Sequence, residues 1–281
     1  MRLLTVKLPP DCDIGLHGDT HFGNALMSRD KLDLFRRWVR RRKSRFWVHM
    51  GDGVDAIPTN DPRYYDGESE QDIPLLQVSE CVRFYRGISN RCLVWIKGNH
   101  PQKHHRIGNL AKEICRRLDV EYGTWTTKLR LINQDTGKQM VKLYLTHSVG
   151  NTLNSRAKDY EQRIANMNAS LKRRMAPLAG DCLIMAMGHT HKLLNCRPAK
   201  RLILYDDGEK IKQKYLEAGD GDAEYIEPDR RWYVNTGSFV KLHKLDTDGY
   251  AERAGYDPIE LGFIIVKIRK GEVVDVEART V

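Results

Sequence analysis

Several features are missing from this sequence of 281 residues. No apolar run approaches the roughly 20 residues of a membrane span, and residues 1–13 lack a signal-peptide core. The six cysteines include no Cys-x-x-Cys pair, and most lie in apolar contexts, so we expect reduced thiols and a cytoplasmic location. Internal repeats and low-complexity tracts are also absent. With 41% hydrophobic and 30% charged residues, these absences predict one globular domain over residues 1–281.

Positive charge is abundant but unevenly placed. The net charge is +10, of which residues 29–45 carry +7 (nine Lys/Arg against two Asp) and residues 156–174 carry +4 (six against two acids). The rest of the chain therefore sums to −1. Such a balance suggests a polyanionic partner such as nucleic acid, provided that the basic segments lie near the site of chemistry.

The central motif follows the apolar run 46–50. Gly51-Asp52-Gly53 ends this predicted buried strand, and Asp55 adds a second carboxylate three residues later. Open α/β sheets keep their chemistry at the carboxyl ends of strands. A Gly-Asp turn after a strand is common in many folds, so this motif gains weight only from others like it.

Four more predicted strands end in the same way. Residues 13–17, 91–97, 139–146 and 181–187 are each followed by Asp, Asn or His. For Asp19-Thr20-His21 alone, an ordinary Asx-turn with an incidental histidine is an equal alternative. His17 and His49 lie inside their strands, so we expect hydrogen-bonded core residues there.

Together the five strand ends supply seven side chains of the kinds that bind metal. These are Asp19, His21, Asp52, Asn99, His147, His189 and His191. Core packing does not explain seven such residues at five strand ends. They predict a site for two divalent transition-metal ions, most simply Mn, with Fe, Zn or Ni accepted by the same ligands. The carboxylate of Asp52, from the middle strand, is placed to bridge the two ions.

The order of these motifs resembles the calcineurin-like metallophosphoesterase superfamily. The series is Asp-x-His, Gly-Asp-x-x-Asp, Gly-Asn-His, His and Gly-His-x-His, and residues 235–238 look like the family's Asn-x-Gly-Ser turn. The resemblance implies an α/β fold, an αββα sandwich of two mixed β-sheets flanked by helices. It also implies two metal positions, listed here by ligand: Asp19, His21, Asp52 and His191 for the first, and Asp52, Asn99, His147 and His189 for the second.

The resemblance further implies phosphoester hydrolysis by a hydroxide that bridges the two ions, because metal-bound water loses a proton near neutral pH. His100, steadied by Asp55, would be the general acid. Lys103, His104, His105 and Arg106 form the only basic cluster beside a motif. They are candidate substrate contacts, with an ordinary surface loop as the alternative.

The substrate class follows from two departures. The phosphoprotein-phosphatase branch has Arg-Gly after the second Asp and Glu after Asn-His, whereas this chain has Ala56 and Pro101. A terminal phosphate favours a bidentate guanidinium clamp, so its absence favours phosphodiesters of a nucleotide or nucleic acid. Two alternatives are a phosphomonoesterase and a binding protein on a decayed scaffold. Nothing in the sequence indicates an oligomeric state.

The remaining elements follow from periodicity. Helices are predicted over 28–43 (with Ser28 as N-cap), 74–88, 107–118 and the polar stretch 151–176, and residues 192–281 form a β-rich region. A helix that starts at the catalytic edge and rises 1.5 Å per residue ends roughly 20 Å away. Arg40 to Arg45, and the end of the second basic segment, are therefore predicted to lie away from the chemistry.

Overall fold

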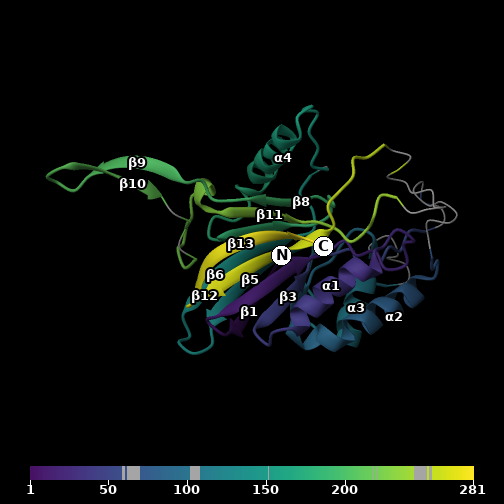
Figure 1. The fold of residues 1–281 in the computed structure, drawn as a ribbon. Coiled ribbons are helices and arrows are strands. Elements are labelled where there is room, and N and C mark those ends of the chain that lie inside the picture. Colours follow the sequence, from purple (N-terminus) through teal and green to yellow (C-terminus); the bar gives the residue numbers. More distant parts are fainter. Residues whose placement is uncertain are drawn as a thin grey trace.

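The protein is described from a computed structural model, which covers residues 1–58, 61, 70–101, 108–150, 152–216, 218–219, 221–243, 252 and 255–281. Two β-sheets face each other, with helices on their outer faces (Figure 1). One sheet has five strands, in the order β13 (Glu272–Thr280), β12 (Gly262–Arg269), β2 (Cys12–His17), β3 (Arg45–His49) and β4 (Cys92–Trp95). The other has six, in the order β1 (Arg2–Leu8), β5 (Thr126–Asn133), β6 (Gln139–Thr146), β7 (Ile184–Met187), β11 (Trp232–Thr236) and β8 (Leu193–Cys196).

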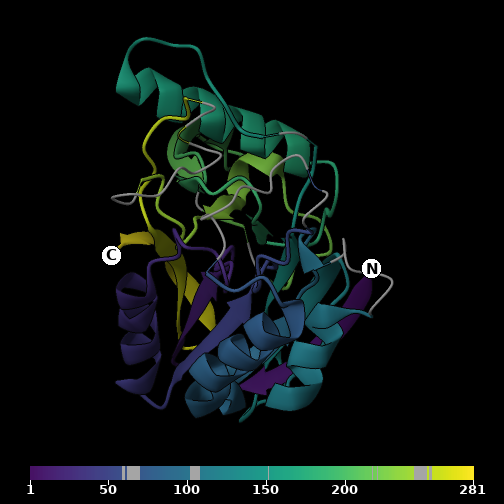
Figure 2. The same ribbon diagram turned by 90° about the vertical axis from the view of Figure 1, so that its right-hand side faces the viewer.

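The helices are unequally divided between the two outer faces. The five-stranded sheet is covered by α1 (Arg29–Arg40), α2 (Pro74–Tyr85) and α3 (Leu110–Leu118), with the 3-10 helix η1 (Arg86–Arg91) after α2 (Figure 2). The six-stranded sheet carries α4 (Tyr160–Met175), and a 3-10 helix, η3 (Pro228–Arg230), precedes β11. Strands β9 (Arg201–Asp206) and β10 (Ile211–Leu216) form a separate hairpin.

Three apolar clusters separate four layers. Ile14, Val48 and Ile184 belong to the cluster between the two sheets. A second cluster joins the five-stranded sheet to its helices through residues such as Phe35 of α1, and a third joins the six-stranded sheet to α4. Burying both faces of each sheet in this way removes apolar surface from water. The structure therefore confirms the predicted αββα sandwich.

The structure corrects two expectations about where helices begin, one for α1 and one for α4. Ser28 precedes α1 at the N-cap position, but its side chain makes no capping hydrogen bond. The segment predicted to be helical over 151–176 is helical only from Tyr160, because Asp159 accepts a hydrogen bond from the Gln162 N–H and caps the helix there. Residues 152–159 are irregular. Within the described residues, no helix combines the length and the apolar character that a membrane span requires.

Two strands were not predicted, β1 and β8. The strands predicted before the five motifs are present, and β5 and β6 form an antiparallel hairpin with its turn between Asn133 and Gln139. Strands β2, β3 and β4 run parallel, as do β6, β7 and β11. Their carboxyl ends meet at one edge of the sandwich, which is where the sequence motifs follow them.

Candidate functional site

All seven predicted ligand residues come together at this edge. Three groups of side chains each hold their potential ligand atoms within 4.8 Å of one another: Asp19, His21 and His191; His21, Asp52 and His100; and Asp52, His147 and His189. The remaining residue, Asn99, places its Oδ1 2.8 Å from His147 Nε2. His21 belongs to the first two groups and Asp52 to the last two, and Asp52 Oδ2 lies 4.0 Å from His21 Nε2, so the geometry can hold two cations that share the Asp52 carboxylate.

The first group has the spacing of a cation site. His191 Nε2 lies 3.6 Å from Asp19 Oδ1, and His21 Nε2 lies 4.0 Å from both Asp19 Oδ1 and Asp52 Oδ2. Ligand atoms that are each about 2.0–2.2 Å from one ion lie roughly 3–4 Å apart. Asp19 Oδ1 and His21 Nε2 are buried, and neither has a hydrogen-bond partner in the described part of the chain. Buried polar atoms are normally satisfied, so these residues fit a metal ion.

In the third group, Asp52, His147 and His189, the imidazole of His147 is held by hydrogen bonds. His147 Nδ1–H donates to the Met50 carbonyl oxygen at 2.8 Å, which turns Nε2 towards Asp52 Oδ2 at 3.1 Å. This Nε2 also faces the Asn99 oxygen, so two acceptors converge on one ring nitrogen. Either a proton or a cation must occupy that position. Orienting a ligand imidazole through its other nitrogen in this way is common around protein metal sites.

In the third group, the charges of Asp52 and His147 shift each other's pKa in opposite directions. Burial alone would raise the pKa of Asp52, but the imidazoles of His147 and His100 outweigh burial and hold the pKa well below its usual value. Burial likewise disfavours charged His147, yet the Asp52 carboxylate raises its pKa to about 9. In the first group, burial raises the pKa of Asp19 to about 6. Metal binding at His147 would therefore displace a proton.

Backbone strain is concentrated on the ligands. Among the described residues, eight non-glycine residues have a positive φ, and five of them are predicted ligands: Asp19 (49°), His21 (46°), Asp52 (49°), His189 (71°) and His191 (58°). Each such left-handed residue costs roughly 1–3 kcal/mol. The sharp turns point successive polar side chains at one place, which neither a continuing strand nor a helix would do.

Two glycines of the motifs leave room for the site. A Cβ on Gly98 would lie 2.0 Å from Asp52 Oδ1, and a Cβ on Gly51 would lie 2.4 Å from His147 Nδ1. Any side chain at either position would displace a ligand. The glycines before Asp52 and Asn99 are thus required for the close packing of these ligand turns.

The turn at residues 235–238 supports the first and last motifs from behind. Ser238 Oγ–H donates to the Asp19 carbonyl oxygen at 2.9 Å, and the Phe239 N–H donates to the same oxygen at 3.2 Å. Asn235 Nδ2–H donates to the Gly188 carbonyl oxygen at 3.1 Å. This turn therefore fixes the backbone beside Asp19 and His189 without contacting the cation positions itself.

His100 and Asp55 lie beside the first group. His100 Nδ1–H donates to the Asp55 carbonyl oxygen at 2.7 Å, and the Asp55 carboxylate lies 3.4 Å from the same nitrogen. His21 Nδ1–H donates to Asp55 Oδ1 at 2.8 Å. Although burial disfavours the charged imidazole, the carboxylates of Asp52 and Asp55 raise the pKa of His100 to about 9. Asp55 thus orients two histidines, and protonated His100 can donate a proton from Nε2.

The two histidines inside the strands are core residues, as predicted. His17 is fully buried, with Nδ1 3.2 Å from the Val48 carbonyl oxygen and Nε2 2.9 Å from the Tyr85 hydroxyl. His49 is fully buried and stacks on Trp95 at 3.6 Å between ring centroids. Neither residue contributes to the three ligand groups.

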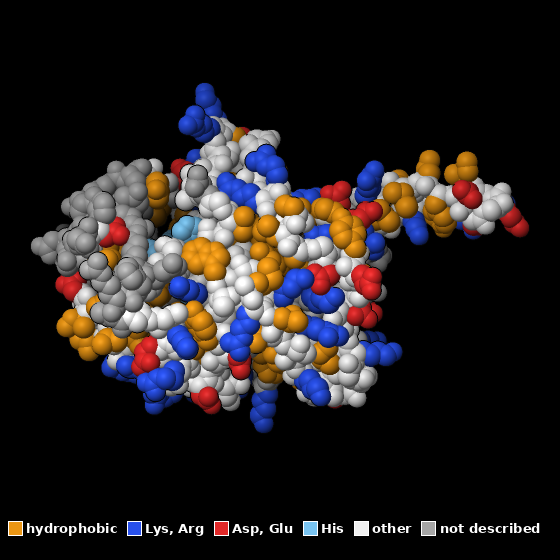
Figure 3. Space-filling view, turned by 180° about the vertical axis from the view of Figure 1, so that it is seen from behind, with side chains coloured by type: hydrophobic (Ala, Val, Ile, Leu, Met, Phe, Trp, Pro, Cys, Tyr) orange, Lys and Arg blue, Asp and Glu red, His pale blue; other side chains and the backbone are white. Residues whose placement is uncertain are grey.

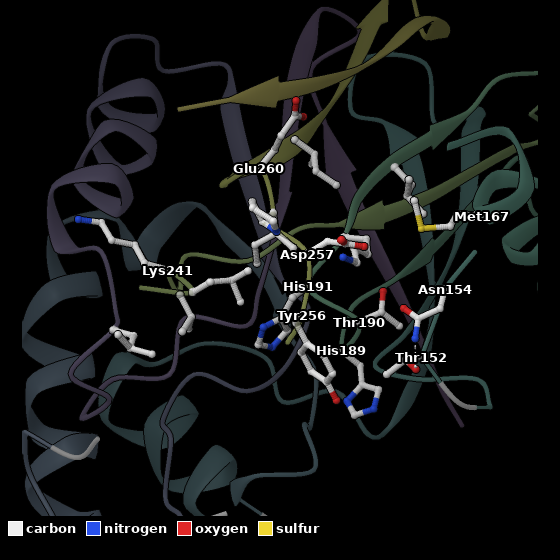
Figure 4. A pocket seen from close by; sticks show the side chains of 18 of the residues that line it. Thr152, Asn154, Met167, His189, Thr190, His191, Lys241, Tyr256, Asp257 and Glu260 are labelled. Atoms are coloured by element: carbon white, nitrogen blue, oxygen red, sulfur yellow. Dashed lines mark hydrogen bonds between the residues drawn. The ribbon is translucent and has the colours of Figure 1, made fainter. Parts of the chain in front are cut away.

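A cavity of about 560 Å³ opens from the ligands. His189, His191 and Tyr256 lie together in it (Figure 4). Its further walls come from segments 152–167 and 255–260, and its cationic lining consists of Arg156, Arg163, Lys192 and Lys241. Arg163 Nη2 lies 2.5 Å from Asp257 Oδ2. A volume of a few hundred Å³ is typical of small-molecule sites.

Of the two basic segments, the first agrees with its predicted place, and the beginning of the second, whose place was not predicted, lies at the site. Arg45 pairs with Asp13 at the start of β2, far from the ligand edge. Arg156 and Arg163 of the second segment line the cavity, because the irregular segment before α4 leads directly from the His147 motif across the site. That proximity in sequence was the available signal. The candidates Lys103, His104, His105 and Arg106 lie outside the described residues.

Comparisons with known proteins find similar structures only. No family model and no curated protein matches the chain. A phosphoesterase from E. coli, Yfce, is 12% identical over 95% of this chain and 98% of that chain, with a TM-score of 0.41. The nuclease MPE from Pseudomonas putida is 11% identical over 95% and 87%, with a TM-score of 0.35. The calcineurin-like phosphoesterase YfkN from Bacillus subtilis is 12% identical over 95% and 89%, with a TM-score of 0.40.

Identities and TM-scores of this size establish neither an activity nor a substrate. The stronger observation is internal to the chain, since motifs from five strand ends meet at one edge of a four-layer sandwich. Sequence motifs and architecture thus agree, since the αββα sandwich that the family resemblance implies is present and the motif residues meet at one of its edges.

Proposed function

We propose that this protein is a dinuclear metal-dependent phosphoesterase that hydrolyses phosphodiester bonds of a nucleotide or nucleic acid. The observation that carries the proposal is the set of three ligand groups linked through His21 and Asp52, with Asp19 Oδ1 and His21 Nε2 buried and unsatisfied in the described part of the chain. Asp19, His21, Asp52 and His191 would hold the first cation. Asp52, Asn99, His147 and His189 would hold the second.

When bound, the cations supply Lewis-acid polarisation of the phosphoester and acidify water. The chain itself supplies the proton for the leaving group. His100 is oriented by the Asp55 carbonyl and carboxylate, and its raised pKa of about 9 keeps it protonated near neutral pH in the metal-free protein. A protonated imidazole held in this way can serve as a general acid.

The preference for a diester rests on the position after Asp55. Ala56 is buried there, and its N–H donates to Gln77 Oε1 at 2.8 Å. No guanidinium can occupy this place to clamp a dianionic terminal phosphate. The arginine and lysine side chains that line the cavity lie beyond the metal-ligand residues instead. There they can contact a substituent on the far side of a diester. A phosphomonoesterase is the alternative function.

The decisive experiment combines metal analysis with substrate comparison. The purified protein, loaded with Mn²⁺, is assayed on bis-(p-nitrophenyl) phosphate and p-nitrophenyl phosphate, then on single- and double-stranded DNA and cyclic nucleotides. We expect about two metal ions per chain and higher kcat/KM for the diester. Faster hydrolysis of the monoester would favour the alternative. A folded protein that binds no transition metal would reject both functions and support a binding role.

The general acid is tested separately. The His100→Gln variant should retain its metal content and lose roughly 10²- to 10⁴-fold in kcat on a substrate with a poor leaving group. The loss should shrink on a p-nitrophenyl ester, because that leaving group needs little protonation. Equal losses on both substrates would contradict this role for His100.

A further inference from the structure

The hairpin of β9 and β10, residues 201–216, projects from the body of the molecule as an arm (Figure 1). Its two strands pair with each other over six residues each and belong to neither large sheet. Figure 3 shows the arm on one side of the molecule and histidine side chains on the opposite side. The arm is therefore separate from the catalytic edge.

One face of the arm is apolar and exposed. The register places Leu202 opposite Tyr215, and Ile211 opposite Asp206, on the same face as Leu204. The exposed fractions are 48% for Leu202, 72% for Leu204, 79% for Ile211 and 63% for Tyr215. An isolated two-stranded hairpin is marginally stable in water, and a contiguous apolar patch of this kind marks an interaction surface.

The opposite face is occupied by contacts within the arm. Lys212 forms an ion pair with Asp207, and Lys214 Nζ lies 4.8 Å from the centroid of the Tyr205 ring. Two of the arm's lysines are thus engaged with its own side chains. This arrangement disfavours a polyanionic partner, which would need those charges, and leaves the apolar face as the one to be covered.

Charge changes sign along the arm. Exposed Lys200 and Arg201 lie at its base, whereas its tip carries three acids, Asp206, Asp207 and Glu209, against Lys210 and the Asp207-paired Lys212. Two arms laid antiparallel would bring each acidic tip beside the basic base of the other arm. A two-fold axis makes such a contact self-complementary.

We propose that the apolar face of the arm packs against the same face of the arm in a second copy of this chain, in antiparallel orientation. Each arm is about 20 Å long, so the buried area falls short of the about 800 Å² per partner of a stable complex. The dimer should therefore dissociate in the micromolar range. Because the arm lies opposite the histidines, both cavities stay open to substrate in the dimer.

Sedimentation velocity on the full chain, from about 1 to about 100 µM, tests this arrangement. The wild type should shift from monomer to dimer over this range. The double variant Leu204→Gln with Ile211→Gln should weaken association at least about tenfold. The matched control, Leu75→Gln with Leu76→Gln, changes two leucines of α2 that are each 48% exposed, and it should dimerise as the wild type does.

Charge reversal tests the antiparallel orientation. Reversing the tip (Asp206→Lys with Glu209→Lys) or the base (Lys200→Glu with Arg201→Glu) should weaken dimerisation in each case. Mixing the two variants should restore it, because every tip then faces a base of opposite charge. Circular dichroism confirms that each variant is folded.

A wild type that stays monomeric throughout the range would overturn the proposal. So would apolar variants that associate normally, or a mixture of charge variants that fails to recover. If the same substitutions instead abolish binding to duplex DNA without changing the mass, the arm contacts nucleic acid and the dimer is rejected.

Discussion

Carboxylates at the amino ends of the strands have lysine or arginine partners, whereas the buried carboxylates at the carboxyl ends have histidine neighbours. At the start of β2, Asp13 lies 2.8 Å from Arg269 and 3.5 Å from Arg45, and before β7, Asp181 lies 2.6 Å from Lys128 and 3.3 Å from Lys142. At the carboxyl ends, buried Asp19 and Asp52 face imidazoles and each other. The described neighbours of these two carboxylates thus include no paired lysine or arginine.

The difference separates an end of the sheets that favours stability from an end that is suited to binding. The chain has many lysines and arginines, and it places them beside acids at one end of the strands. At the other end it combines buried charge, left-handed backbone and unsatisfied ligand atoms. Departures of this kind from stable packing are expected at functional sites. Divalent cations would supply the missing positive charge.

Replacing the shared carboxylate should have the largest effect. We expect Asp52→Asn to bind fewer than one metal ion per chain and to lose roughly a thousandfold or more in kcat/KM. The amide loses the charge that both cation positions share. Elemental analysis and diester hydrolysis measure the two effects. Asp13→Asn, at the other end of the sheet, is the matched control and should keep its full metal content. If Asp52→Asn kept two ions, the shared site would be rejected.

Metal addition should stabilise the folded protein only when the predicted ligand residues are intact. A saturating cation at 100 to 1,000 times its Kd adds about 3–4 kcal/mol to the free energy of unfolding. Thermal unfolding with increasing Mn²⁺ should show a rising Tm for the wild type and for Asp13→Asn. The curve for Asp52→Asn should be nearly flat. An equal rise in all three proteins would mean that Mn²⁺ binds elsewhere.

The same substitution at the two ends should change metal-free stability in opposite directions. Burial raises the pKa of Asp19 to about 6, so above that pH its charge opposes folding, and Asp19→Asn should stabilise by up to about 2 kcal/mol. Asp13→Asn leaves two guanidinium groups without their partner and should destabilise by about 1–3 kcal/mol. Urea unfolding at pH 8 with a chelator measures both. Changes of the same sign would refute the contrast between the ends.

We expect the smallest effect from the ion pairs of Asp181, whose contribution to stability should depend on pH. Burial alone would raise the pKa of Asp181, but Lys128 and Lys142 lower it to about 2. The contribution of ionised Asp181 to the free energy of unfolding is therefore complete above the unfolded pKa of about 3.9. It is lost as the pH falls towards 2. Asp181→Asn should cost less than about 1 kcal/mol at pH 7, since the pair is partly exposed. The difference from wild type should narrow below pH 4 in urea titrations, and a constant difference would exclude the ion pair as its source.

The ligand positions could be predicted from sequence because each motif is local. A buried strand followed by Gly and a polar turn specifies its own end, and the parallel order of β2, β3 and β4 then brings Asp19, Asp52 and Asn99 to one edge. The contact of Asn99 with His147 depends on the packing of two sheets, and only the family resemblance indicated it.

Other parts of the fold depend on distant partners that local patterns do not specify. β1 pairs with β5, more than 100 positions further along the chain, and its side chains alternate between partly buried and exposed. The cavity wall at 152–159 has no regular structure, so periodicity could not place Arg156 there. Strands β9 and β10 lie in the predicted β-rich region, but alternating side chains do not distinguish a projecting hairpin from a strand packed in a sheet.

The hydrogen bond from Ser238 to Asp19 joins residues 219 positions apart. A ribosome releases a chain from its amino terminus, so Asp19 emerges long before the serine that holds its turn in place. The turn that carries Asp19 can therefore reach its final form only after residue 238 has been synthesised.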